Sequence, residues 1–451
     1  MLRLLAIELI VMSTVAPAWA GLRAAVAKVE ITPKTHEVMW GFEDRLAPAE
    51  GTLDPLYARV LVLEAGNKRL AIVTLDLGRS FGEPSLDRLR EVALKSSGIS
   101  CILASASHTH SAPVIKDEYD GQPPAWERAA LEGIESAIAK AAANLQEARI
   151  GVGTGSVYIG HNRLPLRPDG TFGWFERNPT MIPTAPVDPT VTVLRLDSLD
   201  GAPLAILVNY ACHPVVLGSD NRQYSADYPG VMNHVVEDAF GGHVASFFLQ
   251  GAPGDINPYH AVTPIQEDAV KMRDWTGQRL GAEAVRVAKE IHTENASPAS
   301  IDIREESLSF HLRWNQEKFQ AALLKFLGPK TLELEGSPIR PIIESRVAAV
   351  LINKQIAIAT VPGEPFVDFQ KNWRDRCPVP TAMLLGYTNG YHGYFPTISA
   401  TARGGYGAAS ASTWVEPGAG ERIVDWAVVK TYEMLDKLSD LPDDLKRDVY
   451  K

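Results

Sequence analysis

The sequence predicts an α/β fold with a mixed β-sheet core flanked by helices, in a single compact domain. Short runs rich in Val, Ile and Leu alternate with helical patterns along the chain, which is typical of helices packed on sheets. No break between these segments is long enough to be a linker. The chain has 451 residues, enough to bury a large hydrophobic core.

Six short apolar runs are predicted to be strands. Several of them are apolar at every position, which is typical of strands that are buried on both faces. In chain order they are residues 57–63, 70–76, 100–105, 191–196, 204–210 and 244–249.

Three stretches repeat apolar residues every three or four positions, which predicts a helix with one buried face in each. The repeated residues are Leu131, Ile134, Ile138 and Leu145 in the first, Leu280, Ala284, Val287 and Ile291 in the second, and Val424, Ala427, Val428, Thr431, Leu435 and Leu438 in the third.

Three further segments have a recognisable character. Residues 347–352 and 355–360 predict a β-hairpin whose second strand leads into Glu364. Residues 160–189 are dense in Pro, Asn, Gly and aromatic residues without a period, so we expect a long ordered loop of the kind that often carries function. Residues 300–346 are the segment that we expect to form an insertion or subdomain.

The composition excludes some classes of function. The net charge is −10 and the pI is about 5.6, whereas nucleic-acid binding needs clustered Lys and Arg. We therefore expect small-molecule partners and no nucleic acid. Three cysteines, Cys101, Cys212 and Cys377, allow at most one disulfide, and the first two lie in apolar runs where a buried thiol is expected.

Residues 1–20 predict a signal peptide, with Arg3 before an apolar stretch and Ala18-Trp19-Ala20 as the cleavage site. The alternative is a membrane anchor, but Glu8 interrupts the apolar run, which is shorter than the roughly 20 residues that a span needs. We expect cleavage after Ala20, a mature domain of residues 21–451 that is secreted or periplasmic, and no membrane span.

The strongest local signal is the pair His108 and His110, which follows a predicted strand. In an extended backbone, residues two apart project to the same side, so both imidazoles are able to converge on one metal ion or one substrate atom. The alternative is a pair of hydrogen-bonded loop histidines.

Two other predicted strands also end in ligand-type residues, namely His213 and Glu364. The carboxyl ends of strands are where α/β enzymes assemble their sites. Two histidines and a glutamate are a typical zinc set, and imidazole favours zinc over magnesium or calcium. Zinc lowers the pKa of bound water to about 7 and polarises carbonyls, which favours hydrolysis of an amide or ester.

Two polar segments follow strand-like runs. Residues 250–258 are rich in glycine but lack the Gly-Lys-Ser/Thr ending of a phosphate loop, so we expect a tight turn that presents Asp255 and Asn257. Residues 386–396 are rich in tyrosine and glycine, and taken alone they favour a packing corner.

Read together and in this order, these segments resemble the catalytic domain of the neutral/alkaline non-lysosomal ceramidase family. The family's Thr-His-Thr-His-Ser-Gly-Pro stretch is similar to residues 107–113, and its next histidine, after a hydrophobic strand, is similar to His213. Its Pro-Gly-Glu matches residues 362–364. Its Tyr-x-x-Tyr, with another tyrosine twelve residues later, is similar to Tyr391, Tyr394 and Tyr406.

The resemblance extends from about Ala24 to Leu438 and carries a set of site residues. It implies a zinc ion held by four residues: His108, His213, Glu364 and Tyr394. It also implies three residues that line the pocket and bind the substrate carbonyl or oxyanion: His110, Arg163 and Tyr406. Arg163 is assigned because Asn162-Arg163 is similar to an Asn-Arg element in the family's Pro-rich loop.

The chain departs from the family at two points. The family has Gly-Asp-Val-Ser-Pro-Asn, with the serine proposed as the nucleophile, where this chain has Asn257, and asparagine cannot form an acyl-enzyme. The chain also ends soon after Leu438, so we expect it to lack the C-terminal domain of ceramidases and to resemble the shorter bacterial relatives.

We therefore expect a zinc-dependent hydrolase that cleaves a linear N-acyl amide with metal-bound water. Asp255 and Asn257 are candidates for orienting that water or a ligand histidine. The expected substrate is a small N-acyl compound, either a lipid or an acylated sugar. The alternatives are a zinc esterase acting on an acylated carbohydrate or lipid, and a non-catalytic member that uses the pocket to bind a ligand.

Two other metallohydrolase folds fit the sequence less well. A metallo-β-lactamase pattern needs an Asp-His pair after the first two histidines, where this chain has Ser111-Ala112. A barrel amidohydrolase needs eight β/α units, which the spacing of the strands does not supply.

Overall fold

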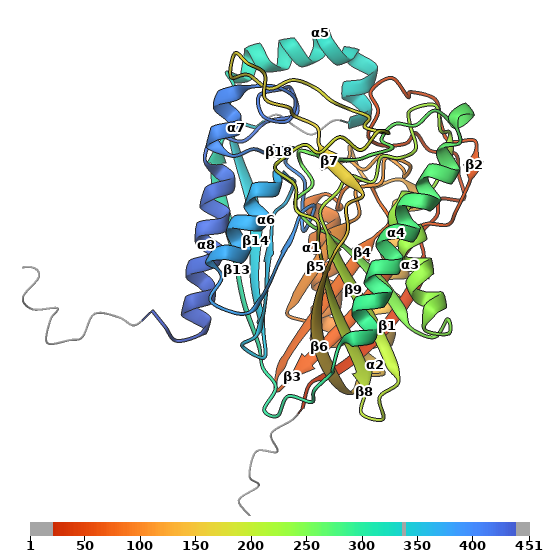
Figure 1. The fold of residues 1–451 in the computed structure, drawn as a ribbon, viewed down its shortest axis with the longest axis vertical. Helices are drawn as coiled ribbons and strands as arrows, with labels where there is room; N and C mark the ends of the chain where they lie inside the picture. Colours follow the sequence, from red (N-terminus) through yellow and green to blue (C-terminus); the bar gives the residue numbers. More distant parts are fainter. Residues whose placement is uncertain (1–20, 336–339, 439–451) are drawn as a thin grey trace, which may run out of the picture.

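The computed structural model describes residues 21–335 and 340–438, and Figure 1 shows its fold. The signal peptide predicted at residues 1–20 lies outside the described residues. Among the residues that are described, two β-sheets dominate the architecture, which confirms the predicted class of a mixed sheet flanked by helices.

The larger sheet is mixed, because β9 and β11 pair in parallel, as do β4 and β5, whereas its other neighbours are antiparallel. Its strands lie in the order β11 (Ala245–Gln250), β9 (Pro203–Tyr210), β8 (Thr190–Ser198), β6 (Gln146–Ser156), β1 (Arg23–Glu30), β3 (Tyr57–Ala65), β4 (Lys68–Leu75) and β5 (Cys101–Ala106). All six strands predicted from apolar runs belong to this sheet.

The smaller sheet has the order β13 (Ile301–His311), β14 (Ile342–Ile352), β15 (Ile356–Thr360) and β17 (Thr381–Leu385). The pairing of β14 with β15 confirms the predicted hairpin. The segment predicted as an insertion or subdomain differs from that prediction, because β13 pairs with β14 over its whole length. Among the described residues between these two strands, α5 (Gln316–Glu335) is the helix that lies outside the sheet.

The two sheets pack face to face. Leu207 and Phe247 of the larger sheet share one apolar cluster with Val350, Ile358 and Met383 of the smaller sheet. Strands in this position are covered on both faces, which explains why the predicted runs are apolar at nearly every position.

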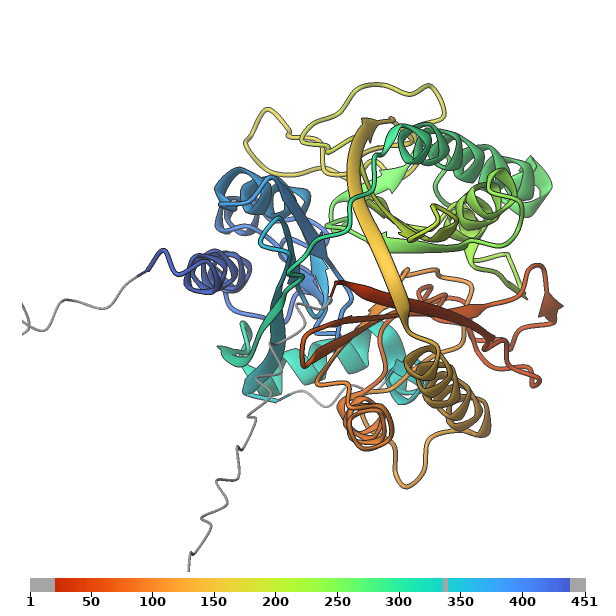
Figure 2. The ribbon, with the colours of Figure 1, turned by 90° about the horizontal axis from the view of Figure 1, so that it is seen from below.

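Helices cover the outer faces of both sheets. On the larger sheet these are α1 (Glu83–Ser97), α2 (Ala125–Ala143), α3 (Asp227–Ala239) and α4 (Ala269–Glu290), and on the smaller sheet α6 (Val367–Arg376) and α8 (Ala419–Met434). Figure 2 shows α6 and α8 on one side of the molecule and α3 and α4 on the other. The order of layers is therefore helix, sheet, sheet, helix.

The remaining elements are short. Residues 160–189 are mostly irregular, as predicted, and contribute β7 (Gly160–Asn162), which pairs with β12 (Ile256–Pro258). The others are β2 (Gly51–Thr52) with β10 (Gln223–Tyr224), β16 (Glu364–Pro365) with β18 (Tyr394–Phe395), α7 (Ile398–Arg403) and the 3₁₀ helix η1 (Ile265–Glu267). No helix in the described part of the chain combines the length and the apolar character that a membrane span requires.

Candidate metal centre and cavity

His108 follows β5 and lies where the larger sheet meets the smaller one. Its backbone has a φ of 72°, a left-handed conformation that turns the chain sharply after the strand. The backbone N–H donates to the carbonyl of Leu77, and Nδ1 lies 2.6 Å from the carbonyl oxygen of Gly78. The side chain is only 2% exposed. Its Nε2 atom is therefore directed inward, toward the other sheet.

His213 follows β9 and is fixed in a similar way. Its Nδ1 lies 2.7 Å from the carbonyl oxygen of Pro253 and 3.1 Å from that of Ile256. Pro253 lies in the turn before β12, and Ile256 is the first residue of β12. The ring centroids of His108 and His213 are 5.0 Å apart. Two strand ends of one sheet thus place two imidazoles side by side, as the sequence predicts.

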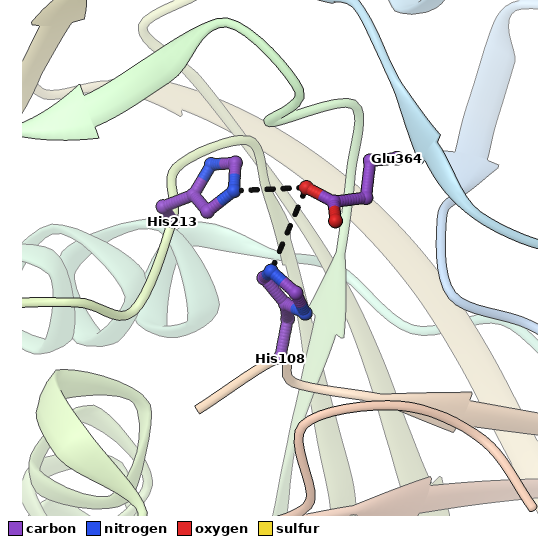
Figure 3. Close-up of side chains that lie close together, drawn as sticks. All are labelled: His108, His213 and Glu364. Atoms are coloured by element: carbon purple, nitrogen blue, oxygen red, sulfur yellow. Dashed lines mark hydrogen bonds and ion pairs between the residues drawn. The ribbon is translucent and has the colours of Figure 1, made fainter. Parts of the chain in front are cut away.

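Glu364 reaches the same point from the smaller sheet, at the start of β16. Its Oε2 atom lies 3.1 Å from Nε2 of His213 and 3.6 Å from Nε2 of His108 (Figure 3). Tyr391 donates to the other carboxylate oxygen at 2.6 Å, and Tyr387 donates to Oε2 at 3.2 Å. The three ligand atoms of His108, His213 and Glu364 lie within 4.8 Å of one another.

The electrostatics of this cluster fit a bound cation. A carbonyl oxygen only accepts, so the proton of each imidazole is assigned to Nδ1, and both Nε2 lone pairs face the carboxylate. Burial lowers the pKa of His108 to about 4 and also lowers that of His213. Burial alone would raise the pKa of Glu364, but the neighbouring histidines hold it below its ordinary value.

Two neutral nitrogen acceptors and one carboxylate therefore converge in a buried place. Such a set is costly without a positive charge between its members, and it is a donor set that zinc accepts. The residues thus fit a divalent cation of the kind that the sequence predicts.

Tyr394 and Tyr406 lie next to these three residues. Tyr394 is in β18, whose pairing with β16 places it opposite Glu364, and its phenol oxygen accepts from Nη2 of Arg163 at 2.8 Å. The ring of Tyr406 lies 5.6 Å from that of Tyr394 and is 43% exposed. Both tyrosines line the cavity beside the cluster.

His110 also lines this cavity, and its Nε2 lies 3.2 Å from Nε2 of His108. Arg163 is not among the described residues that form the cavity wall. It contacts the rings of Tyr394 and Tyr406, which do form part of the wall, and so lies behind them. The structure thus differs from the expectation that Arg163 lines the pocket.

Asp255 and Asn257 occupy the predicted turn, but the hydrogen bonds of their side chains go to residues other than His213. The Asp255 carboxylate accepts from Asn162 at 2.7 Å and from the backbone N–H of Val367 at 2.8 Å. Burial raises its pKa to about 7. The ligand histidine is instead oriented by the backbone carbonyls of the same turn.

The cavity has a volume of about 360 Å³ and three kinds of wall. One part of the wall consists of His108 and Glu364 of the cluster with Tyr391, Tyr394 and Tyr406. Its apolar wall consists of Trp40, Phe81, Leu312, Phe319, Leu323, Ile342, Ile343 and Trp414. Charged side chains form the rest: Glu43, Glu83, Asp117, Glu118, Arg340, Glu344 and Arg346. Phe319 and Leu323 belong to α5, which lies at the same end of the molecule as β7 and β18 (Figure 1).

The sequence reasoning missed two contacts of Glu364. Tyr387 and Tyr391 hold its carboxylate, yet the tyrosine-rich segment that contains them had favoured a packing corner when taken alone.

Gly41 was also missed. It has a φ of +99°, and an added Cβ would lie 2.3 Å from the ring of His110. A glycine beside a catalytic candidate leaves no periodic signal in a single sequence.

A comparison with known families identifies the family of the chain. Residues 23–282, more than half of the chain, match the model of the neutral/alkaline non-lysosomal ceramidase N-terminal domain. The chain belongs to this family. The match includes His108, His110, Arg163 and His213, whereas Glu364 and the tyrosines lie beyond its end.

Two ceramidases are similar to part of this chain at low sequence identity. The chain is 26% identical over 253 residues to the neutral ceramidase of Pseudomonas aeruginosa, a match covering 52% of this chain and 37% of that protein. It is 27% identical over 176 residues to neutral ceramidase B of Dictyostelium discoideum, covering 35% of this chain and 23% of that protein. The matched regions thus span well under half of either ceramidase.

Solved ceramidase structures share the fold. One, described as a ceramidase complexed with C2, has a TM-score of 0.72 at 18% identity and covers 94% of this chain and 77% of the other. A crystal structure of the neutral ceramidase from Pseudomonas aeruginosa has a TM-score of 0.71 at 19% identity, with coverage of 94% and 76%. At this coverage the similarity of fold extends over both sheets.

Proposed function

We propose that this member of the ceramidase family is a zinc-dependent hydrolase of a linear N-acyl amide. The observation that carries the proposal is the convergence of Nε2 of His108, Nε2 of His213 and a carboxylate oxygen of Glu364, with His108 and Glu364 on the wall of a cavity. Membership of a family whose model is named for ceramidase supports the reaction class.

Zinc held at these three residues would supply a Lewis acid that polarises a carbonyl and activates water. The side chains around it have separate roles in the proposal. Tyr394 would be a fourth, displaceable ligand. His110 and Tyr406 face the cavity and stabilise negative charge on the carbonyl oxygen. Tyr387 and Tyr391 hold the Glu364 carboxylate in its orientation.

Water, rather than a side chain, is the nucleophile in this proposal. Asn257 stands where the family's serine is expected, and both ends of its amide are already hydrogen bonded, to Arg163 and to the carbonyl of Glu176. The side chain is 2% exposed and is not part of the cavity wall. It therefore has neither the chemistry nor the access to attack a substrate.

The substrate is proposed to be a small N-acyl compound, either a lipid or an acylated sugar. The apolar wall under α5 suits an acyl chain, and the charged side chains elsewhere on the cavity suit a polar amine portion. Ceramide itself is one member of this class. The names of the curated relatives support it as a substrate to test first.

Metal analysis coupled to a substrate panel tests the proposal. Purified protein should contain zinc, release the acyl group from an N-acyl sphingoid base or an N-acyl amino sugar, lose activity with a chelator and regain it with zinc. O-acyl counterparts with the same chains serve as matched substrates, and preferential cleavage of those would identify an esterase instead. A zinc-loaded protein that binds N-acyl compounds without turnover would contradict the hydrolase proposal in favour of a binding protein.

We also propose that the protein is exported and that residues 1–20 are removed. The apolar stretch and Ala18-Trp19-Ala20 support this proposal. The N-terminal sequence of protein recovered from the periplasm or medium of a bacterial host should begin at Gly21. Recovery only from the cytoplasm, with Met1 retained, would contradict it.

A further inference from the structure

Arg163 is a buried cation without a carboxylate partner among the ion pairs of residues 21–335 and 340–438, since none of them includes it. It is 4% exposed. Its Nη2 donates to the carbonyl of Gly254 at 2.7 Å and to the phenol oxygen of Tyr394 at 2.8 Å. Its Nη1 donates to the amide oxygen of Asn257 at 3.0 Å. Three neutral acceptors therefore fix a charged, planar group.

Aromatic rings complete the surroundings of this guanidinium. Its central carbon lies 5.2 Å from the ring centre of Trp174, 5.6 Å from that of Tyr394 and 5.3 Å from that of Tyr406. Such distances are typical of cation–π contacts, which favour a charge that has been removed from water. Arg163 is thus held directly behind two tyrosines of the cavity wall.

Asn257 is built to hold the guanidinium in one orientation. Its Nδ2 donates to the carbonyl of Glu176 at 3.1 Å, so a flip of the amide would lose that bond and the bond to Arg163 together. The backbone N–H of Arg163 donates to the carbonyl of Asp255, close to the pairing of β7 with β12. Both partners are therefore anchored to the same pair of short strands.

The consequence for Tyr394 follows from hydrogen-bond chemistry. A phenol oxygen that accepts from Arg163 keeps its own O–H available to donate elsewhere. Tyr394 lines the cavity beside Glu364, so a fixed Arg163 determines where the phenol oxygen lies relative to the cluster. A guanidinium that was free to rotate would leave the phenol without this constraint.

We propose that Asn257 is a positioning residue, whose amide oxygen orients Arg163 so that Arg163 holds the Tyr394 phenol at the metal centre. Its contribution to catalysis rests on the proposed function, whereas its contribution to geometry does not. Asn257, which stands where the resemblance places the family's serine, instead orients the side chain of Arg163.

Four variants of the full chain test this inference: Asn257→Ala, Asn257→Asp, Arg163→Met, and the double variant Asn257→Ala with Arg163→Met. Asn257→Ala should lower kcat about 10- to 100-fold while KM changes little. The reason is that the change disturbs Arg163, which holds Tyr394, and leaves the residues that contact the substrate in place. Asn257→Asp keeps an acceptor for Nη1 but loses the donor to the carbonyl of Glu176, so it should lose clearly less activity than Asn257→Ala. A loss in Asn257→Asp as large as in Asn257→Ala would contradict the role of the oxygen.

The double variant tests whether Asn257 acts through Arg163. Asn257→Ala should cause less than about a two-fold further loss of kcat in the Arg163→Met background, whereas independent effects would multiply. Asn178→Ala is the matched control. Asn178 is a buried asparagine in the loop of residues 160–189, which also contains Arg163, and both ends of its amide are hydrogen bonded to the backbone of Ile182. It should lower the thermal midpoint without changing kcat.

Two readouts need no substrate. The visible spectrum of Co²⁺-loaded protein should change in Asn257→Ala and stay unchanged in Asn178→Ala. A crystal structure of the metal-free Asn257→Ala variant should show a rotated guanidinium and a displaced Tyr394 phenol. An unchanged Arg163–Tyr394 contact in that structure would overturn the inference, even if no N-acyl substrate is ever turned over. Failure of the proposed function alone, including a failure to bind metal, would leave the change in the metal-free crystal structure in place.

Discussion

At the scale of single residues, the backbone prepares the two histidines for their partner. Carbonyl groups of Gly78, Pro253 and Ile256 accept from the Nδ1 atoms, which fixes the tautomer and the ring orientation before any ligand arrives. Glu364 then faces nitrogen atoms that cannot donate to it. Replacing His108 or His213 should therefore reduce metal retention more than it reduces the stability of the fold.

The substitution His213→Ala should abolish metal retention and activity together, because it removes one of three convergent ligand atoms. We expect zinc content after dialysis to fall at least about tenfold relative to the parent protein, measured by elemental analysis. His260→Ala is the matched control, since His260 packs on Trp275 and is not part of the described cavity wall. A metal-loaded, active His213→Ala protein would remove the assignment.

Asp255 predicts a pH dependence of stability. Its pKa is about 7 in the folded chain, because of burial, and near 3.8 when unfolded, so the folded state binds more protons between those values. The stabilisation is full below about pH 4 and is lost as the pH rises toward 7. Asp255→Asn should remove this loss, on the order of 1–4 kcal/mol between pH 5 and 8, in urea unfolding of metal-free protein.

Asp188→Asn is the control for that measurement. Asp188 is also buried, but Arg374 holds its pKa below the ordinary value against the effect of burial. It therefore does not titrate between pH 5 and 8, and its replacement should leave the difference in stability between these two pH values unchanged. If Asp255→Asn had as steep a loss as the parent protein, another group would have to be responsible.

At the scale of elements, the site lies where strands end and where segments of the backbone approach one another closely. β5 and β9 deliver the histidines from one sheet, and the turn after β15 delivers Glu364 from the other. Glycines permit the close contacts. A Cβ at Gly254 would lie 2.6 Å from the carbonyl oxygen of Glu364, and one at Gly363 would lie 2.4 Å from that of Gly393. Side chains at these positions would push the strand ends apart.

Gly41→Ala should impair the site more than it impairs the fold. The added Cβ would lie 2.3 Å from the His110 ring, so we expect His110 to move and activity to fall about tenfold or more. Gly121→Ala is matched in backbone conformation, with a φ of +108° against +99°, but its Cβ would meet nothing within 4 Å. Both should lose about 1–3 kcal/mol through backbone strain. Equal activity in the two variants would contradict the prediction.

The elements also show where local pattern reasoning ends. The hairpin of β14 and β15 is readable because its strands are adjacent in the sequence and share a short turn. β13 was assigned to an insertion because its partner β14 lies beyond α5, and a pairing across so long a connection leaves no local pattern. The same reason hides the pairing of β16 with β18, which places Glu364 opposite Tyr394.

At the scale of the whole molecule, the candidate centre joins the two sheets. Two of its ligands belong to the larger sheet and the third to the smaller, and behind them the sheets share one apolar cluster. A bound cation would therefore link the two halves of the core, because its ligand bonds can form only when the sheets are packed together.

Metal removal should lower the thermal midpoint. A ligand at a hundred times its dissociation constant stabilises the folded state by about 2.7 kcal/mol, which corresponds to roughly 3 °C for a chain of this size. Calorimetry with and without a chelator measures the difference. The chelator should have no effect on His213→Ala, which serves as the control. An identical midpoint for the parent protein in both conditions would argue against a structural link by metal.

The sequence by itself determined the α/β class, six of the eight strands of the larger sheet, and His108, His213 and Glu364 as ligand candidates. Apolar runs, helical stripes and polar residues at strand ends are local patterns, and a linear chain records them directly. Only the tertiary structure decided that Arg163 stands behind the cavity wall, that Asn257 holds it, and that Tyr387 and Tyr391 hold Glu364. These contacts join residues far apart in the chain, and their partners are set by the packing of two sheets, which no local pattern encodes.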